Sequence, residues 1–277
     1  MLPQAKVPQA KAPARLALVI GNGAYENAPA LKNPVNDAAD MCAALRKSGF
    51  KTLCHTNLRS RAEFDASVKD YVDQLGPNTV GLFYYSGHGV QANNANYLIP
   101  TQVQPEAMSR DPLRVLYGLD EVFARLRQKP TRFQLVILDA CRTDLFSAAP
   151  NQASGRGPNT AQRSALIRSL ETVSRASNGL AEINGVPPGT MVFYATASKE
   201  AAFDGEGRNG PLTKHVLQHI RTPGLEVGAF FKRVTRAVET ETVRDYGKRQ
   251  TPFISGSFTG EFCFALCPGE GDPGNPL

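Results

Sequence analysis

The stretch Gln134-Leu-Val-Ile-Leu-Asp-Ala-Cys-Arg-Thr143 decides the fold class of this chain. Its first half is apolar on both faces and rich in branched residues, which is typical of a strand buried inside a parallel sheet. The run ends in Asp139 and Cys141. Because open α/β sheets bind ligands beyond the carboxyl ends of their strands, a carboxylate and a thiol are expected at a functional edge. The alternative is that Cys141 is a small buried hydrophobe, as most free cysteines are.

Strands and helices alternate along the rest of the chain. Strands are expected at 15–20, 50–55, 79–85, 135–138, 190–195 and 253–257, and helices at 38–47, 61–75, 119–126, 211–220 and 225–243. This alternation predicts a three-layer α/β/α sandwich around a mainly parallel six-stranded sheet. We expect a single domain over residues 15–266, between a Pro/Ala/Gln/Lys-rich leader at 1–14 and a loose Gly/Pro-rich tail at 267–277.

Composition excludes some classes of function. The chain has 277 residues, 42% hydrophobic and 20% charged, which suits a globular protein with a real core. No apolar run approaches the ~18–20 residues that span a bilayer, so a soluble protein without a membrane partner is expected. The net charge of +6 is scattered and no Trp is present, so nucleic acid is not an expected partner. The compartment stays open: cytoplasmic, or exported if a signal peptide has been removed.

Five cysteines occur, at positions 42, 54, 141, 263 and 267. None forms a C-x-x-C pair, and Cys263-x-x-x-Cys267 has no matching second half, so a structural zinc site is not expected. The odd number fits one working thiol and four others. Whether those four are reduced or paired is left open by their spacing.

A histidine follows another apolar strand, in Tyr84-Tyr-Ser-Gly-His-Gly89. If the two strands are neighbours, His88 and Cys141 open on the same edge of the sheet. A thiol needs a nearby base to become a nucleophile, and imidazole provides one that later protonates the leaving amine. The N–H groups of Gly89 and Cys141 are candidates for an oxyanion hole. The alternative is a capping or core histidine.

These two motifs resemble those of the caspase–metacaspase clan of cysteine peptidases. The chain is most similar to the bacterial members called orthocaspases, from about residue 15 to 266. The resemblance includes Ala17-Leu-Val-Ile-Gly21 and the 204–213 segment, and a 53-residue separation between His88 and Cys141. The histidine of caspases lies roughly 50 residues before the cysteine. The resemblance implies a caspase-like fold, with Cys141 as nucleophile and His88 as acid and base.

The resemblance also implies an internal division of the domain. Residues 15–146 would be large-subunit-like and 189–266 small-subunit-like, joined by a linker at 147–188 that is cleaved on activation. Loops longer than ~12–15 residues are usually functional or disordered. This linker contains four arginines, at positions 156, 163, 168 and 175. We therefore expect self-processing within it.

Substrate specificity follows from charge. In metacaspases three residues line the P1 pocket: an Asp two before the nucleophile, an Asp in the Asn-Asp-Ala turn and a Ser two before the histidine. The matching residues in this chain are Asp139, Asp37 and Ser86. Carboxylates suit a guanidinium or ammonium group. The prediction is a cysteine endopeptidase that cleaves after Arg or Lys. Asp37 as a helix cap and Ser86 as a partner of local backbone are the alternatives.

The chain departs from the metacaspase pattern after the nucleophile, where Arg142-Thr143-Asp144 replaces His-Ser-Gly. Metacaspases often need calcium, but no EF-hand loop is present, so no obligatory metal and no cofactor are expected. The expected partners are protein or peptide substrates, and the expected state is a monomer. One alternative function is a catalytically silent caspase-like interaction module, since fold does not imply function. A different α/β thiol or ester hydrolase is disfavoured because no Gly-x-Ser-x-Gly-type elbow surrounds Cys141.

Overall fold

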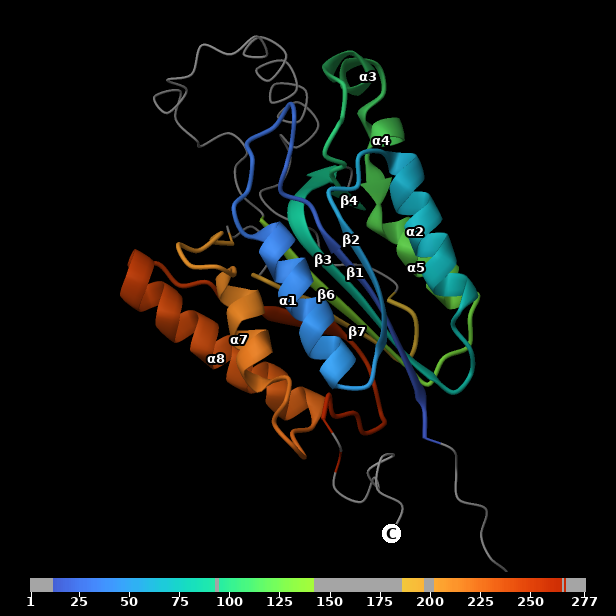
Figure 1. Cartoon of the computed structure of the whole chain (residues 1–277), viewed down its shortest axis with the longest axis vertical. Helices are drawn as coiled ribbons and strands as arrows, with labels where there is room; N and C mark the ends of the chain where they lie inside the picture. Colours follow the sequence, from blue (N-terminus) through green and yellow to red (C-terminus); the bar gives the residue numbers. More distant parts are fainter. Residues whose placement is uncertain (1–11, 93–94, 142–185, 197–201, 266, 268–277) are drawn as a thin grey trace, which may run out of the picture.

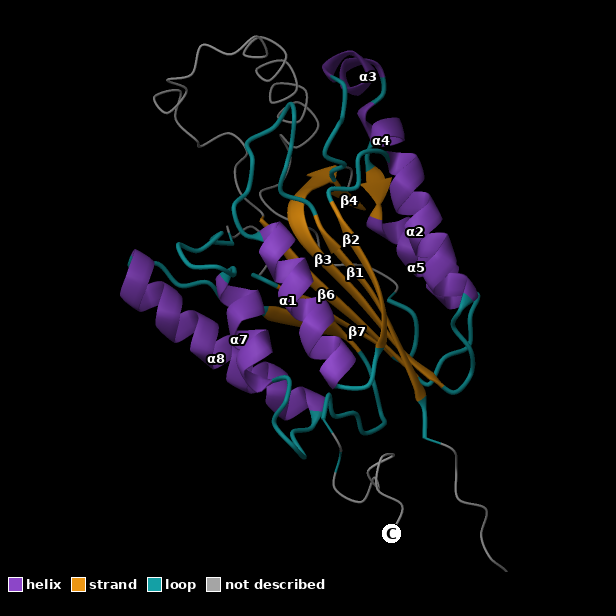
Figure 2. Cartoon of the chain, viewed as in Figure 1, coloured by secondary structure: helices purple, strands orange, loops and turns teal. Residues whose placement is uncertain are grey.

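Six strands form the spine of one sheet in the computed structural model, in the order β2–β1–β3–β6–β7–β8 (Figures 1 and 2). The structure describes residues 12–92, 95–141, 186–196, 202–265 and 267. The strands are β1 (Ala14–Gly21), β2 (Lys51–Thr56), β3 (Thr79–Ala92), β6 (Phe133–Cys141), β7 (Thr190–Tyr194) and β8 (Phe253–Gly256). All neighbours pair in parallel except β7 and β8. The predicted mainly parallel sheet is confirmed.

Two short strands extend the sheet beyond the six predicted. The strand β4 (Ala95–Leu98) runs antiparallel to the end of β3, and β5 (Tyr117–Gly118) runs antiparallel to β4, so the sheet has eight strands. The helices α3 (Pro105–Arg110) and α4 (Pro112–Val115) lie between them in the chain. The elements α3, α4 and β5 are too short to show a clear hydrophobic period, which is why the sequence did not predict them.

Helices cover both faces of the sheet (Figure 1). On one face lie α1 (Pro34–Lys47), α7 (Pro211–His219) and α8 (Val227–Tyr246), and on the other lie α2 (Arg61–Asp73) and α5 (Leu119–Arg127). The β6 strand shows why its run is apolar throughout: Leu135 and Ile137 pack under the first group, and Val136 and Leu138 pack under the second. Burying each such side chain contributes roughly 1.5–3 kcal/mol.

The two strands that carry the site are longer than the sequence suggested. The prediction ended the third strand at Tyr85, but β3 continues through the histidine motif to Ala92. The β6 strand likewise reaches Cys141. Ser86 therefore pairs with Asp139, and His88 pairs with Cys141, across neighbouring parallel strands. Hydrogen bonding to a neighbouring strand, which a one-dimensional pattern does not show, keeps the polar Ser-Gly-His-Gly motif extended.

The four cysteines left open by the sequence are joined in two disulfides. Cys42 of α1 is bonded to Cys54 of β2, and Cys263 is bonded to Cys267 near the end of the described chain. The pairing accounts for the apparent half-motif Cys263-x-x-x-Cys267. Cys141 belongs to neither of these pairs.

Several predicted segments fall outside the described residues. These are most of the leader, almost all of the 147–188 linker with its four arginines, and the tail after Cys267. Among the helices that are described, none combines the length and apolar character needed to cross a membrane.

Candidate active site

His88 and Cys141 are register partners on β3 and β6. Neighbouring strands lie about 4.7–4.9 Å apart, so the two backbones are brought to adjacent positions at one edge of the sheet. Cys141 is described here by its backbone alone. The condition set by the sequence, that the two strands be neighbours, is met.

The hydrogen bonds of the His88 ring identify its tautomer. Nε2 lies 2.7 Å from the carbonyl oxygen of Pro29. Because that carbonyl can only accept, Nε2 must carry the ring hydrogen, and Nδ1 keeps a free lone pair. Nδ1 is buried and has no hydrogen-bond partner among the described residues. A basic nitrogen is thus held ready while the opposite side of the ring is anchored.

Burial sets the charge of this ring. Only 3% of the His88 surface is exposed. Desolvation lowers the pKa of His88 to about 4, although the Pro29 carbonyl acts in the opposite direction. The imidazole is consequently neutral at pH 7, which is the protonation state that a general base requires.

Two buried carboxylates lie beside the histidine strand. Asp37 Oδ1 accepts hydrogen bonds from the Gly210 N–H and the Asn209 side chain, both at 3.1 Å. Its Oδ2 accepts from the Ser86 hydroxyl at 3.1 Å. Asp139 Oδ2 accepts from the Thr213 hydroxyl at 2.5 Å and from the Thr213 N–H at 3.2 Å. The three predicted pocket residues, Asp37, Ser86 and Asp139, are therefore brought together.

Asp37 is not the cap of its helix, and the Ser86 hydroxyl is bonded to a distant side chain. Asn33 occupies the N-cap of α1, and Asp37 lies one turn inside the helix with its carboxylate turned to the 209–210 segment and to Ser86. The Ser86 hydroxyl donates to that carboxylate across 49 residues of sequence.

The two carboxylates are held in an environment that disfavours negative charge. Burial, and next the charge of Asp139, raise the pKa of Asp37 to about 8. Burial raises the pKa of Asp139 to about 6, even though Thr213 donates two hydrogen bonds to it. No described ion pair joins either carboxylate to a Lys, Arg or His, although Arg208, which is hydrogen-bonded to Asp40, also interacts with the charge of Asp37. Burial outweighs that interaction, so the pKa values of both carboxyls stay raised.

A third acid, Asp204, belongs to the same region and was given no role by the sequence. Its charge contributes to the raised pKa of Asp139, and burial raises its own pKa. Asp204 Oδ2 accepts from the Lys32 N–H at 3.2 Å. The signal was present in the 204–213 segment, where an acid is followed by turn-forming glycines, but its neighbours in space could not be read from the chain.

The loop that carries Asp204 and Gly210 is tied to α1. Arg208 donates to both oxygens of Asp40, at 2.8 and 2.9 Å, and Asn209 bridges Asp37 and Asp40. The Asn33 amide donates to the carbonyl oxygens of Asp204 and Gly205. These bonds fix the 204–210 segment over the amino-terminal half of α1 and so hold the acidic pocket in place.

Gly89, predicted for the oxyanion hole, lies in β3 opposite Leu98 of β4. It follows His88 directly and lies at the same sheet edge as Cys141. The two N–H groups are thus contributed by neighbouring strands, and their role remains a prediction.

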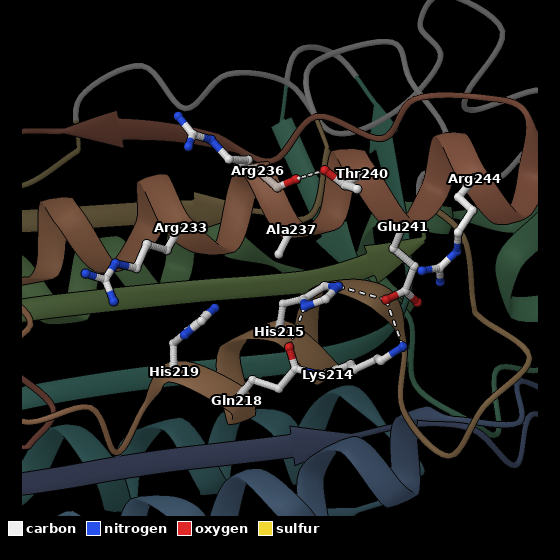
Figure 3. A pocket seen from close by; sticks show the side chains of 10 residues that line it. All are labelled: Lys214, His215, Gln218, His219, Arg233, Arg236, Ala237, Thr240, Glu241 and Arg244. Atoms are coloured by element: carbon white, nitrogen blue, oxygen red, sulfur yellow. Dashed lines mark hydrogen bonds and ion pairs between the residues drawn. The ribbon is translucent and has the colours of Figure 1, made fainter.

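A separate hollow of about 530 Å³ lies between α7 and α8 (Figure 3). Its lining includes one lysine and three arginines, and Glu241 is hydrogen-bonded to His215 at 2.7 Å and to Lys214 at 2.8 Å. None of the predicted site residues lines it. In the described part of the chain, no three His, Cys, Asp or Glu side chains form a metal-binding group.

A three-layer sheet protein with a histidine and a cysteine paired on central strands belongs to a recognisable class, that of caspase-type cysteine peptidases. Comparison with family models agrees: the caspase domain family, Peptidase C14, matches residues 14–263, and the chain belongs to this family. Membership of the caspase–metacaspase clan, as predicted from the two motifs, is confirmed.

Individual relatives are distant. The human mucosa-associated lymphoid tissue lymphoma translocation protein 1 and its mouse homologue are each 28% identical to the chain over 128 residues. That match covers 46% of the chain and 15% of each relative, so the chain corresponds to a small part of them. Caspase-1 from Spodoptera frugiperda superposes with a TM-score of 0.61 at 12% identity, covering 98% of both chains. The likeness to this structure confirms the caspase-like fold.

Proposed function

We propose that this chain is a cysteine endopeptidase that hydrolyses peptide bonds after Arg or Lys. The observation that carries the proposal is a pair of buried carboxylates, Asp37 and Asp139, that lie beside the His88 strand and form no described ion pair. A P1 guanidinium or ammonium group would supply the missing charge, and a guanidinium can bind a carboxylate through two parallel hydrogen bonds. Asp204 adds further negative charge to the same pocket.

Cys141 and His88 would hydrolyse the peptide bond in two steps, acylation and deacylation. The Cys141 thiol passes its proton to His88 Nδ1, and the sulfur attacks the scissile carbonyl carbon. The N–H groups of Gly89 and Cys141 would stabilise the resulting oxyanion. The protonated Nδ1 then donates to the leaving amine, which leaves a thioester on Cys141. Nδ1 next removes a proton from water, whose oxygen displaces the sulfur and releases the carboxylic acid product, and the proton on Nδ1 returns to the Cys141 sulfur.

The environment of His88 suits the transfer of a proton to the leaving amine. A ring with a pKa of about 4 holds a proton weakly, so it would transfer that proton readily to the leaving amine. The Pro29 carbonyl, bonded to Nε2, stabilises the positive charge that develops on the ring in between. The same hydrogen bond keeps the ring from rotating, so Nδ1 serves in both steps.

A fluorogenic peptide with Arg at P1 tests the proposal. We expect turnover by the purified chain and none by Cys141→Ala. Turnover that survives Cys141→Ala, or absence of turnover together with no labelling of Cys141 by an Arg-containing chloromethyl ketone, would reject the peptidase and favour a silent caspase-like interaction module.

Self-processing in the 147–188 linker is part of the same proposal, since four of the linker's residues are arginines. Intact-mass measurement after incubation should show two fragments that separate after one of these arginines, and Cys141→Ala should stay whole. We also expect a monomer that needs no metal. Elution at the monomer volume in size-exclusion chromatography and activity that persists in EDTA are the corresponding measurements.

A further inference from the structure

Two buried tyrosines converge on the backbone of His88 from different parts of the chain. The Tyr25 hydroxyl oxygen accepts a hydrogen bond from the His88 N–H at 2.8 Å. The Tyr85 hydroxyl donates to the His88 carbonyl oxygen at 2.7 Å. The two hydroxyl oxygens lie 3.3 Å apart. Neither tyrosine was given a role by the sequence.

The direction of each hydrogen bond is fixed by chemistry. The His88 N–H can only donate and its carbonyl can only accept. The proton of Tyr85 therefore points to the carbonyl, so between the two hydroxyls Tyr25 must be the donor. The result is a closed ring of three hydrogen bonds that satisfies both backbone polar groups of His88. The His88 carbonyl also accepts from the Ile99 N–H at 3.2 Å, which joins the ring to the edge of β4.

Tyr25 also contacts the imidazole itself. Its ring centroid lies 4.4 Å from that of His88, with an angle of 43° between the planes. Tyr25 and Pro29 both belong to the segment between β1 and α1. One segment thus holds His88 at three points: the backbone N–H, the face of the ring, and Nε2.

The glycine before the histidine leaves room for this arrangement. Gly87 has a φ of +154°, and a methyl group there would lie 2.6 Å from the Tyr85 hydroxyl oxygen and 2.7 Å from that of Tyr25. It would also lie 3.0 Å from the Asn22 carbonyl oxygen. Two of these distances are shorter than any normal contact, so a side chain at this position would displace the hydroxyl ring. The glycine of Ser86-Gly-His-Gly89 is thereby explained by the two tyrosines.

We propose that Tyr25 and Tyr85 are positioning residues, which together fix the orientation of His88 so that Nδ1 faces the attacking thiol. This inference rests on the proposed peptidase function. It predicts that the two hydroxyls act as one unit, because removing either one opens the same ring.

The experiment uses Tyr25→Phe, Tyr85→Phe and the double variant in the full chain. Each single change should lower kcat for the Arg peptide roughly 10- to 100-fold with little change in KM, since small misplacements of a catalytic group have effects of that size. The double variant should lose little more than the worse single variant. Tyr117→Phe is the matched control, because Tyr117 is fully buried and its hydroxyl has no described hydrogen-bond partner. It should keep wild-type kcat.

A second measurement separates positioning from folding and from the peptidase proposal. The rate of Cys141 alkylation by iodoacetamide, measured against pH, reports the thiol–imidazole pair without any P1 recognition. Tyr25→Phe and Tyr85→Phe should change this pH profile while circular dichroism stays native, and Tyr117→Phe should not change it. If the two Phe variants change the pH profile of Cys141 alkylation but the wild type cleaves no Arg peptide, the proposed function fails and the positioning role survives. If both Phe variants keep kcat and the alkylation profile within about twofold of wild type, the positioning role is overturned.

Discussion

Asp37 and Asp139 approach the same glycine from two different elements. A methyl group at Gly210 would lie 3.3 Å from Asp139 Oδ2 and 3.6 Å from Asp37 Oδ2. Asp37 comes from α1 and Asp139 from β6, and both are buried. Each of these carboxyls is more easily protonated than a free one. The gap between them is where the proposed P1 cation would bind.

Replacing Asp139 by Asn should remove much of the preference for basic P1 residues. Hydrogen bonds to charged groups contribute about 1.5–3 kcal/mol, so KM for an Arg peptide should rise roughly 10- to 100-fold. The matched substrate has citrulline at P1, which keeps the shape of Arg without its charge. The wild type should discriminate strongly between the two peptides, and Asp139→Asn should discriminate weakly. Undiminished discrimination would refute the pocket assignment.

Gly210→Ala should impair the same pocket by filling it. The backbone at Gly210 has a φ of −61°, which any residue adopts, so the fold should be kept. The added methyl group would occupy space between the carboxylates, and KM for Arg peptides should rise while thermal unfolding changes little. Gly207→Ala, in the same loop, is the control, because its added methyl group would only graze the Asn209 carbonyl oxygen at 4.0 Å.

The rate should increase with pH between about 6 and 8. Because their pKa values are raised, Asp139 and Asp37 are protonated at low pH and ionise in this window, and the ionised forms bind a cationic substrate. We expect kcat/KM for Arg peptides to rise across it and Asp37→Asn to flatten the upper part of the rise. His88 has its pKa near 4 and should not contribute there. A profile that is flat from pH 6 to 8 would contradict this account.

Burial of neutral His88 should make the protein less stable in acid. Its pKa falls from 6.5 to about 4 on folding, so the unfolded chain binds the proton more readily. The free energy of unfolding is therefore highest, as far as His88 is concerned, above pH 6.5. It falls by about 3 kcal/mol as the pH drops toward 4. Asp37 and Asp139, with raised pKa values, act in the opposite direction. Urea unfolding at several pH values, compared between wild type and His88→Gln, isolates the histidine effect as the difference.

When the chain is denatured without reduction, only one thiol, that of Cys141, should react. After reduction, all five cysteines should react. Alkylation followed by intact mass distinguishes these states. Reduction should also lower the unfolding temperature, since a disulfide closing a loop the size of that between Cys42 and Cys54 stabilises by about 3 kcal/mol. Three or more reactive thiols in the oxidised protein would contradict the pairing.

Local patterns carried much of the fold and of the site. The apolar run before Asp139, buried on both faces, predicted a central parallel strand, and the helical spacing around Met41 and Phe64 predicted two of the covering helices. His88 and Cys141 were found because each follows such a run. These inferences succeed because strand burial and helix amphipathicity repeat over a few residues.

Contacts between distant segments were not predictable in this way. Asp204 joins the acidic pocket, and Tyr25 reaches His88, only because the 202–210 segment and the segment between β1 and α1 lie near the site in the folded chain. The pairing of Cys42 with Cys54 likewise depends on α1 lying beside β2.

The sequence by itself determined the class of fold, the family and the two residues of the candidate dyad. The tertiary structure decided which nitrogen of His88 is basic, because the tautomer depends on the Pro29 carbonyl. It also decided the protonation of Asp37 and Asp139. A pKa reflects burial and the distance to other charges, and both are set by packing between elements far apart in the chain.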